Sequence, residues 1–354
     1  MGHAVAEFFG ATLGDPGHWN LSPEWYGTQG GGYGRDAGEV VFERESACGN
    51  GRVTPDCLAA DYLKTVASAA AIVISAWPAE LRRHCLQALC TDASGTGAAV
   101  ASGDPARAAA APGAASGLLP WRACAVCVGV GGGALPLFLS HHFPGLLVDA
   151  VELDAAVLEA ATTAMGLPEC RANLHLHCAD GAEWVAQAAE AVHAQEQPPH
   201  DLVLLDAFDG DDAVPACFTQ PGAPFLTSLA DALHPRHGAL VANLHCARPR
   251  AAWPWGARGG GDAVGAGARE RAELAATARA FRDALLVPGN GAAWLAHAPQ
   301  QANAVVVVAR GVALPREPRQ AARQLVDAAR RTGAEAGFCF DAGNRAARLL
   351  QVIE

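Results

Sequence analysis

The sequence predicts an α/β fold: a mostly parallel, seven-stranded sheet with helices on both faces, ending in an antiparallel hairpin and preceded by an N-terminal strand/helix extension. Three observations support this fold class. Short apolar runs alternate with helical patterns over residues 124–243, as strands and crossover helices do in a parallel sheet. A glycine cluster, Gly129 to Gly133, follows the first apolar run. An acidic residue, Glu152, ends the second run, as in a nucleotide-binding βαβ unit.

The N-terminal extension is expected over residues 1–92, with a strand over 39–43 and helices over 54–75 and 79–90. Thr54 fits the N-cap of the first helix, because its hydroxyl can accept a hydrogen bond from a free amide of the first turn. Pro55 fits the first helical position, where its missing N–H costs nothing.

Residues 93–119 are predicted to be a flexible Ala/Gly-rich insert, which leaves one domain over residues 120–354. Asp154 fits the N-cap of the second helix of this domain, and Gly166 fits its end. The polar turn between two late apolar runs predicts the hairpin. The expected strands lie near 124–128, 146–152, 173–178, 202–206, 239–243, 292–296 and 304–308, and the expected helices near 134–142, 155–165, 181–194, 222–234, 269–286 and 316–331.

Composition narrows the function class. The net charge is −11, with 36 acidic against 25 basic residues and no long basic run, so a nucleic-acid partner is not expected. Eleven scattered cysteines indicate thiols in a reducing compartment, and the cytoplasm is the expected location. No targeting signal is visible at the N-terminus, and the uncharged stretch 123–148 contains glycines and prolines, so no membrane span is expected.

Glycine or acidic residues follow four successive predicted strands. In an open α/β sheet these strand ends share one crevice, where ligands bind. Glu152 follows Gly129 at about the 20-residue spacing at which an acidic side chain holds ribose hydroxyls. The glycines allow close approach of backbone to a ligand. In chain order the strand ends carry Gly129, Gly131 and Gly133, then Glu152, then Asp180 and Gly181, then Asp206 and Asp209.

These motifs resemble the class I methyltransferases of the spermidine synthase type, and within them the group around methyltransferase-like protein 13 with its plant and algal relatives. The resemblance covers about residues 122–245 and implies a Rossmann-like class I methyltransferase fold with S-adenosyl-L-methionine as cofactor. It rests on residues 128–138, His142-Phe143-Pro144, residues 149–154, Ala179-Asp180-Gly181 and residues 201–206.

The resemblance also implies roles for single residues. Gly129, Gly131 and Gly133 would line the methionine part of the cofactor, Glu152 would hold the ribose, and Asp180, next to Gly181, would accept from the adenine amino group. Asp206 and Asp209 resemble the pair of spermidine synthase aspartates that bind and deprotonate the acceptor amine, which suggests a protein lysine or N-terminus as methyl acceptor and Asp206 as general base. A homodimer is also possible by this resemblance.

Two other functions stay open at this point. Spermidine synthases carry an aspartate inside the glycine turn, where this chain has Gly132, so the charge that holds an aminopropyl donor is missing and methyl transfer is favoured over aminopropyl transfer. A non-catalytic nucleotide-binding module is the second alternative. The turn also satisfies the dinucleotide fingerprint, but the acidic end of the fourth strand argues against a nicotinamide enzyme.

No metal site is expected. Cys124 and Cys127 form a C-x-x-C inside a strand, where their side chains point to opposite faces, so they are predicted to be buried thiols. His175 and His177 share one face of the third strand, but no metal-ligand spacing joins them to other residues.

Overall fold

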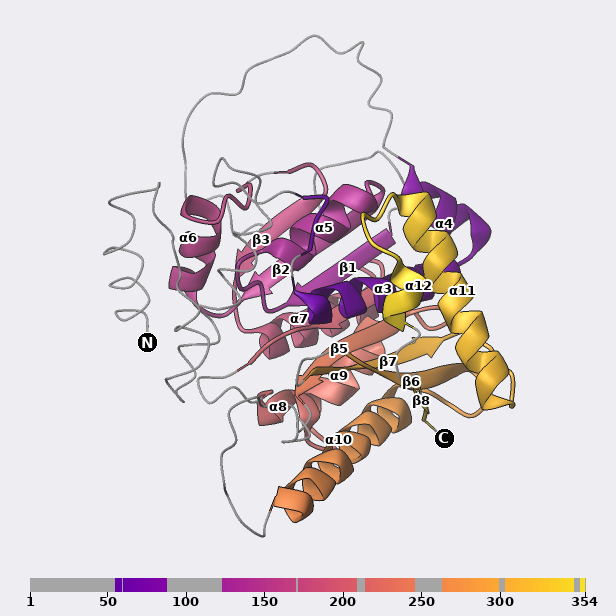
Figure 1. Ribbon diagram of the computed structural model, residues 1–354. Helices are drawn as coiled ribbons and strands as arrows, with labels where there is room; N and C mark the ends of the chain where they lie inside the picture. The colour runs from indigo at the N-terminus through magenta and orange to yellow at the C-terminus, as the bar shows by residue number, and fades with distance from the viewer. Residues whose placement is uncertain are drawn as a thin grey trace, which may run out of the picture.

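A sheet of eight strands forms the centre of the computed structural model (Figure 1). The structure describes residues 55–58, 60–87, 123–169, 171–208, 214–245, 263–298, 303–346 and 351–353. The strands are β1 Ala123–Val128, β2 Leu146–Glu152, β3 Leu174–Cys178, β4 Leu202–Leu205, β5 Ala239–His245, β6 Gly291–His297, β7 Asn303–Arg310 and β8 Gln351–Val352.

The strand order is β3-β2-β1-β4-β5-β7-β6-β8. The first five strands in this order are parallel, whereas β7 is antiparallel to β5 and to β6. The predicted fold class is therefore confirmed, with β6 and β7 as the predicted hairpin. The two-residue β8, which pairs with β6, was not predicted. The strand expected over 39–43 lies outside the described residues.

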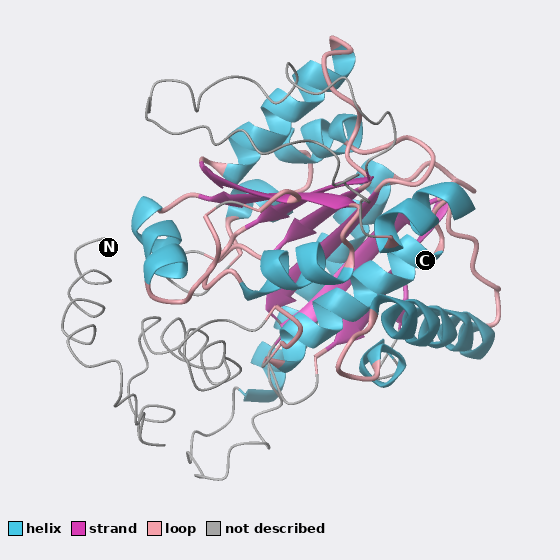
Figure 2. Ribbon diagram, turned by 90° about the horizontal axis from the view of Figure 1, so that it is seen from above, coloured by secondary structure: helices cyan, strands magenta, loops and turns pink. Residues whose placement is uncertain are grey.

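Helices cover both faces of the sheet (Figure 2). One face carries α3 Asp61–Ser75, α5 Ala134–His142, α6 Ala155–Thr163, α11 Pro318–Ala336 and α12 Ala342–Ala346, with α4 Ala79–Leu86 beside β1 and β2. The other face carries α7 Gly181–His193, α8 Ala216–Thr219, α9 Pro224–Ala232 and α10 Ala263–Leu285.

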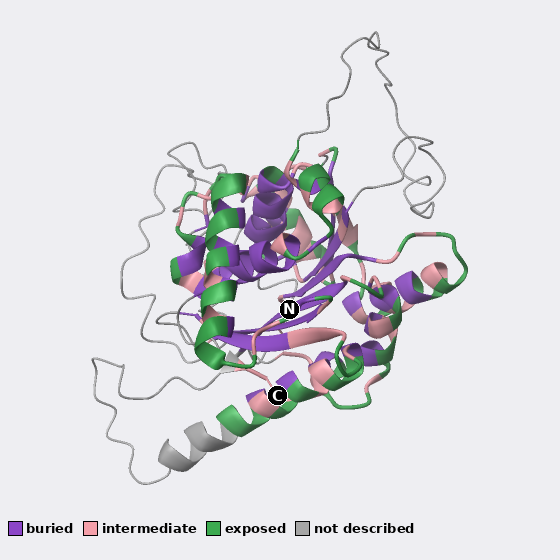
Figure 3. Ribbon diagram, turned by 90° about the vertical axis from the view of Figure 1, so that its right-hand side faces the viewer, coloured by how far each residue is buried: buried purple, intermediate pink, exposed green. Residues whose placement is uncertain are grey.

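Two hydrophobic cores result, one on each face of the sheet. Successive residues of a strand point to opposite faces, so Ala125 and Cys127 enter one core while Val126 and Val128 enter the other. Parallel strands covered on both faces are apolar throughout, and this explains the continuous apolar runs of the sequence. Figure 3 shows the buried strands between helices whose outer faces are exposed.

The start of α3 corrects one prediction. The helix begins at Asp61, whereas residues 55–56 form a turn. Ala60 occupies the N-cap position without a side-chain cap, and Thr54 lies outside the described residues. The Thr-Pro pair is a local signal, but the helix forms where its apolar residues meet the core. All but three residues of α3 are buried.

Helix α3 packs on β5 and β7 and against α11 and α12 (Figure 1). Its Asp61 carboxylate also pairs with Arg345 of α12 at 2.8 Å. The helical part of the predicted N-terminal extension therefore shares one core with the C-terminal half of the chain. Helix α4 ends at Leu86, earlier than predicted.

The prediction that Cys124 and Cys127 are buried thiols is confirmed for Cys127. No disulfide joins the seven cysteines that the structure describes; Cys127 is buried and Cys124 partly buried. Burial raises the pKa of the Cys127 thiol well above its ordinary value, so this thiol is unreactive. Among the described helices, none combines the length and the apolar character that a membrane crossing needs.

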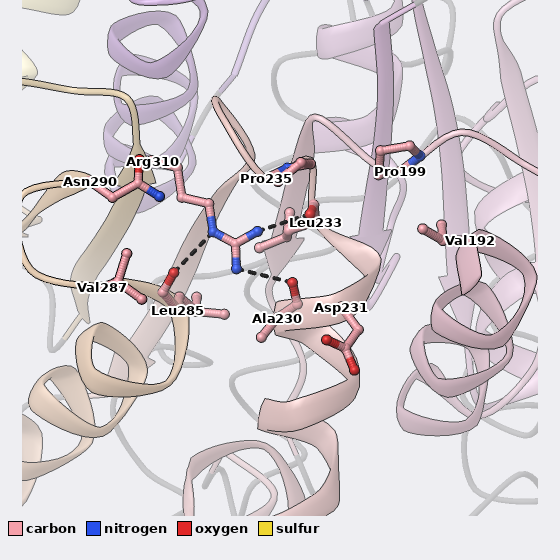
Figure 4. A pocket seen from close by; sticks show the side chains of 10 residues that line it. All are labelled: Val192, Pro199, Ala230, Asp231, Leu233, Pro235, Leu285, Val287, Asn290 and Arg310. Atoms are coloured by element: carbon pink, nitrogen blue, oxygen red, sulfur yellow. Dashed lines mark hydrogen bonds between the residues drawn. The ribbon is translucent and has the colours of Figure 1, made fainter. Parts of the chain in front are cut away.

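Arg310, at the end of β7, ties the sheet to two helices (Figure 4). Its Nε donates to the carbonyl of Leu285 at 3.0 Å, its Nη1 to Leu233 at 2.9 Å and its Nη2 to Ala230 at 3.0 Å. The pocket next to this guanidinium is also lined by Val192 of α7. It lies at the amino ends of the parallel strands, opposite the predicted crevice, and its cation is already engaged by carbonyl oxygens.

We expect Arg310→Ala to lower the free energy of unfolding by about 2–4 kcal/mol, because three partly buried carbonyls lose a charged donor. The matched control is Arg323→Ala on an exposed position of α11, which should change stability by less than about 0.5 kcal/mol. Urea unfolding followed by circular dichroism measures both. Equal effects of the two substitutions would contradict the role assigned to Arg310.

Candidate functional site

The glycine turn after β1 is shaped by contacts between strand ends. Gly129, Gly131 and Gly133 have φ values of 90°, 52° and 86°, in the left-handed region that disfavours side chains. A Cβ on Gly129 would lie 2.2 Å from the carbonyl oxygen of Asp206, at the end of β4. A Cβ on Gly133 would lie 2.7 Å from the side chain of Leu167. Contact with backbone thus requires glycine at position 129, whereas at position 133 the positive φ and the Leu167 side chain together favour it.

Gly131 differs from its two neighbours. It is exposed, and a Cβ built on it would find no atom within 4 Å. Its positive φ nevertheless favours glycine, so the turn offers bare backbone beside open space. This open side is the part of the turn where a ligand has room to lie.

The carboxylate of Glu152 faces this turn. Its Oε2 accepts hydrogen bonds from the amides of Val130 at 2.9 Å and Gly131 at 3.3 Å, and its Oε1 accepts from the amide of Asp154 at 3.2 Å. Three bonds to rigid backbone fix the orientation of the side chain. A carboxylate has about four acceptor positions, so Glu152 keeps capacity for a further donor.

Asp180 is the N-cap of α7. Its Oδ1 accepts hydrogen bonds from the amides of Ala182 at 2.7 Å and Glu183 at 3.2 Å. Capping of the helix is therefore one reason for an aspartate at this position. Both bonds end on one oxygen of an exposed carboxylate, so Oδ2 points to no partner among the described residues. Gly181 is buried, and a Cβ there would lie 2.3 Å from Val128 Cγ1. Gly181 therefore serves the packing of α7 on β1.

Asp206 lies at the end of a chain of polar side chains across three strands. Its Oδ1 accepts from Asn243 Nδ2 at 2.7 Å, and Asn243 Oδ1 accepts from Asn303 Nδ2 at 3.2 Å. Burial raises the pKa of the Asp206 carboxyl to about 6, although the bond from Asn243 lowers it in part. A carboxylate with this pKa is ionised at neutral pH and still basic enough to accept a proton.

Sequence reasoning missed Asn243 and Asn303. Asn243 is buried in β5, and a buried amide needs hydrogen-bond partners. A single polar residue in the apolar run 239–244 was the signal that could have indicated a partner at the neighbouring strand end. Asp209, the second predicted catalytic residue, lies outside the described residues.

The predicted site residues meet at neighbouring strand ends. Strand β1 pairs with β2 on one side and β4 on the other, so the sheet changes direction of winding at β1. Gly129 donates to the carbonyl of Val151 at 2.9 Å and contacts Asp206 across the other strand. Asp180 lies one strand further out. This is the switch point where open α/β sheets bind ligands.

The glycine turn also begins α5, whose N-cap Gly133 has no capping side chain. The positive end of a helix favours an anion, and exposed backbone amides can donate to one. The site therefore combines an acceptor for hydroxyl groups, open backbone, a helix N-terminus and a basic carboxylate. It fits a nucleoside ligand with an anionic tail.

No family model matches the chain. Among curated proteins it is similar to the eEF1A lysine and N-terminal methyltransferase of Homo sapiens, with 35% identity over 124 residues that cover 34% of this chain and 17% of the relative. The Mus musculus protein of the same name is 35% identical over 123 residues, which cover 34% of this chain and 17% of that protein. The chain thus spans about a sixth of the length of these relatives.

Solved structures give a similar comparison. Human methyltransferase-like protein 13 in complex with SAH has 24% identity, covers 60% of this chain and 82% of that chain, and superimposes with a TM-score of 0.44. A probable spermidine synthase from Corynebacterium glutamicum has 15% identity, covers 85% and 76%, and gives a TM-score of 0.45. The predicted resemblance to the group around methyltransferase-like protein 13 is confirmed by the curated relatives over about a third of the chain.

Proposed function

We propose that this chain is an S-adenosyl-L-methionine-dependent methyltransferase whose acceptor is a protein amine, either a lysine side chain or an N-terminus. The observation that carries the proposal is the carboxylate of Glu152, which is fixed by backbone amides beside the open side of Gly131. The similarity to methyltransferases over 124 residues supports the reaction class.

The residues fit the cofactor by their chemistry. Glu152 would accept from the ribose hydroxyls, and Oδ2 of Asp180 would accept from the adenine amino group. The turn around Gly131 and the N-terminus of α5 would face the amino-acid tail, whose carboxylate suits a helix N-terminus. When bound, S-adenosyl-L-methionine supplies a methyl group activated by its sulfonium.

Asp206 would act on the acceptor. An amine is protonated at neutral pH and must lose its proton before it can attack, so a base beside it is required. The bond from Asn243 holds Asp206 in one orientation, and the raised pKa makes its carboxylate a better base than an exposed one. Asp209 would be its partner in binding the ammonium. Positioning of the two substrates supplies the rest of the rate.

Gly132 favours methyl transfer over aminopropyl transfer. It is buried in the turn and provides no carboxylate to hold a cationic aminopropyl group. Intact S-adenosyl-L-methionine carries a carboxylate that an aspartate at position 132 would repel, and Gly132 adds no such charge. Because the similar curated proteins are eEF1A lysine and N-terminal methyltransferases, eEF1A is the first acceptor to test. A cytoplasmic location is proposed on the thiol content of the chain.

The cofactor proposal predicts that Glu152→Gln weakens S-adenosyl-L-methionine binding about 10- to 100-fold, because the amide loses a charge-assisted acceptor for hydroxyl groups. Glu159→Gln on the exposed side of α6 is the matched control and should bind normally. Calorimetric titration with S-adenosyl-L-methionine, its decarboxylated form and NAD measures both variants. Tighter binding of the decarboxylated cofactor, together with aminopropyl transfer to putrescine, would establish the alternative enzyme instead.

The base proposal predicts a pH profile. Protonation removes the base, so kcat/KM should fall about tenfold per pH unit below about 6 and level off above it. Asp206→Asn should lower kcat by about 10²- to 10⁴-fold at pH 7.5 while S-adenosyl-L-methionine still binds. Asp327→Asn, an exposed aspartate of α11, should leave the rate unchanged. Full turnover by Asp206→Asn would eliminate Asp206 as the base.

Asp206→Asn should not destabilise the protein at neutral pH. Its carboxyl pKa is raised on folding, so the ionised form costs stability above about pH 6, and this cost disappears as the pH falls toward the ordinary value. The neutral amide avoids it. An unchanged or higher unfolding midpoint therefore separates loss of catalysis from loss of fold.

Methyl transfer is measured by mass spectrometry of purified eEF1A. Binding of S-adenosyl-L-methionine without any transfer to eEF1A or other proteins would favour a non-catalytic module.

A further inference from the structure

We propose that Asp149, His175 and His177 form a binding site for a divalent transition-metal cation of the zinc class. No metal site was expected from the sequence, because His175 and His177 have no third ligand at metal-binding spacing along the chain. The sheet supplies the third ligand, since β2 and β3 are parallel and Asp149 pairs with His175 in their register.

The side chains converge on one carboxylate oxygen. His177 Nε2 lies 2.8 Å and His175 Nδ1 3.5 Å from Asp149 Oδ1, and one ligand atom from each residue lies within 4.8 Å of the other two. Ligands of a tetrahedral zinc ion at about 2.0–2.1 Å are separated by roughly 3.3 Å. The two separations from Asp149 Oδ1 bracket this value, and the two histidine nitrogens lie within 4.8 Å of each other, so side-chain rotations can bring the three atoms to coordination distance.

The ligand set suits a borderline-soft cation. Imidazole nitrogens and one carboxylate bind zinc and its first-row neighbours, whereas calcium and magnesium prefer oxygen ligands. The Asp149 side chain is only 10% exposed, and a buried carboxylate needs a compensating charge. His175 is 48% exposed, so the cluster is open to water on one side, where a fourth ligand can bind.

A neighbouring helix holds His177 in place. The ring of His177 packs against Trp184 of α7, with ring centroids 4.2 Å apart. Strand β3 is the edge strand of the sheet, so a cation held by β2 and β3 would join the edge to its neighbour. Asp149 lies about 10 Å along the strand from Glu152, so this site is separate from the proposed cofactor site.

The test uses untagged full-length protein, treated with a chelator and with its thiols alkylated so that cysteines do not compete. Zinc titration by calorimetry should show one site, and the cobalt complex should give the strong visible absorption of a four-coordinate N/O site. His175→Ala, which changes an exposed side chain, should weaken zinc binding at least about tenfold. It should also abolish the rise of the urea midpoint that zinc produces in the unmodified protein.

His193→Ala is the matched control. His193 is an exposed histidine of α7 that pairs with Asp231 at 3.3 Å, outside the cluster. It should bind zinc as the unmodified protein does. Asp149→Asn should lose zinc binding as His175→Ala does. If Asp149→Asn does not fold, the comparison of His175→Ala with His193→Ala still tests the proposal. Equal zinc affinity of His175→Ala and His193→Ala, or no zinc binding by the unmodified protein, would overturn the proposal.

Discussion

The close approach of β1 and β4 at their carboxyl ends is the constraint on which the site depends. The carbonyl oxygen of Asp206 occupies the space that a side chain at position 129 would need, so only glycine allows the two strand ends to meet. Because they meet, the glycine turn is placed between the carboxylates of Glu152 and Asp206, which come from strands on either side of β1. A wider separation would move the carboxylate proposed to bind the nucleoside away from the carboxylate proposed to accept a proton. The first glycine of the motif thus sets the geometry of the crevice before any ligand binds.

The same residues serve the fold and the proposed chemistry. Asp180 caps α7 with one oxygen and presents the other, and Glu152 orders the turn while it keeps capacity for another donor. Asp206 is held by Asn243, which itself is held by Asn303 of the antiparallel β7. The terminal hairpin therefore supports the proposed base from outside the parallel part of the sheet. Polar groups at these strand ends are ordered mainly by backbone amides and by one another, so little reorganisation is needed when ligands bind.

Local sequence patterns predicted most helices and strands, but they did not predict contacts between segments that are distant in the sequence. Apolar runs, the glycine turn and the cap at Asp154 are encoded within a few residues, and the structure has them where the sequence indicated. The start of α3 was misplaced because Thr54-Pro55 is a local signal, whereas burial against β5 and β7 determines the helix. Asn243 and Asp149 were missed for a related reason. Their partners lie on neighbouring strands, and the spacing along the chain does not reveal which residues the register brings together.

The burial of α3 has a consequence for how the chain folds during synthesis. This almost entirely buried helix is synthesised before the surfaces that cover it, because β5, β7, α11 and α12 all follow it in the chain. Until they emerge, α3 has no native partner for most of its surface, and exposed apolar segments of this kind favour aggregation or chaperone capture. Contacts of such long sequence separation also slow folding, because a long loop must close before they form. The folding of α3 therefore depends on segments that are synthesised after it.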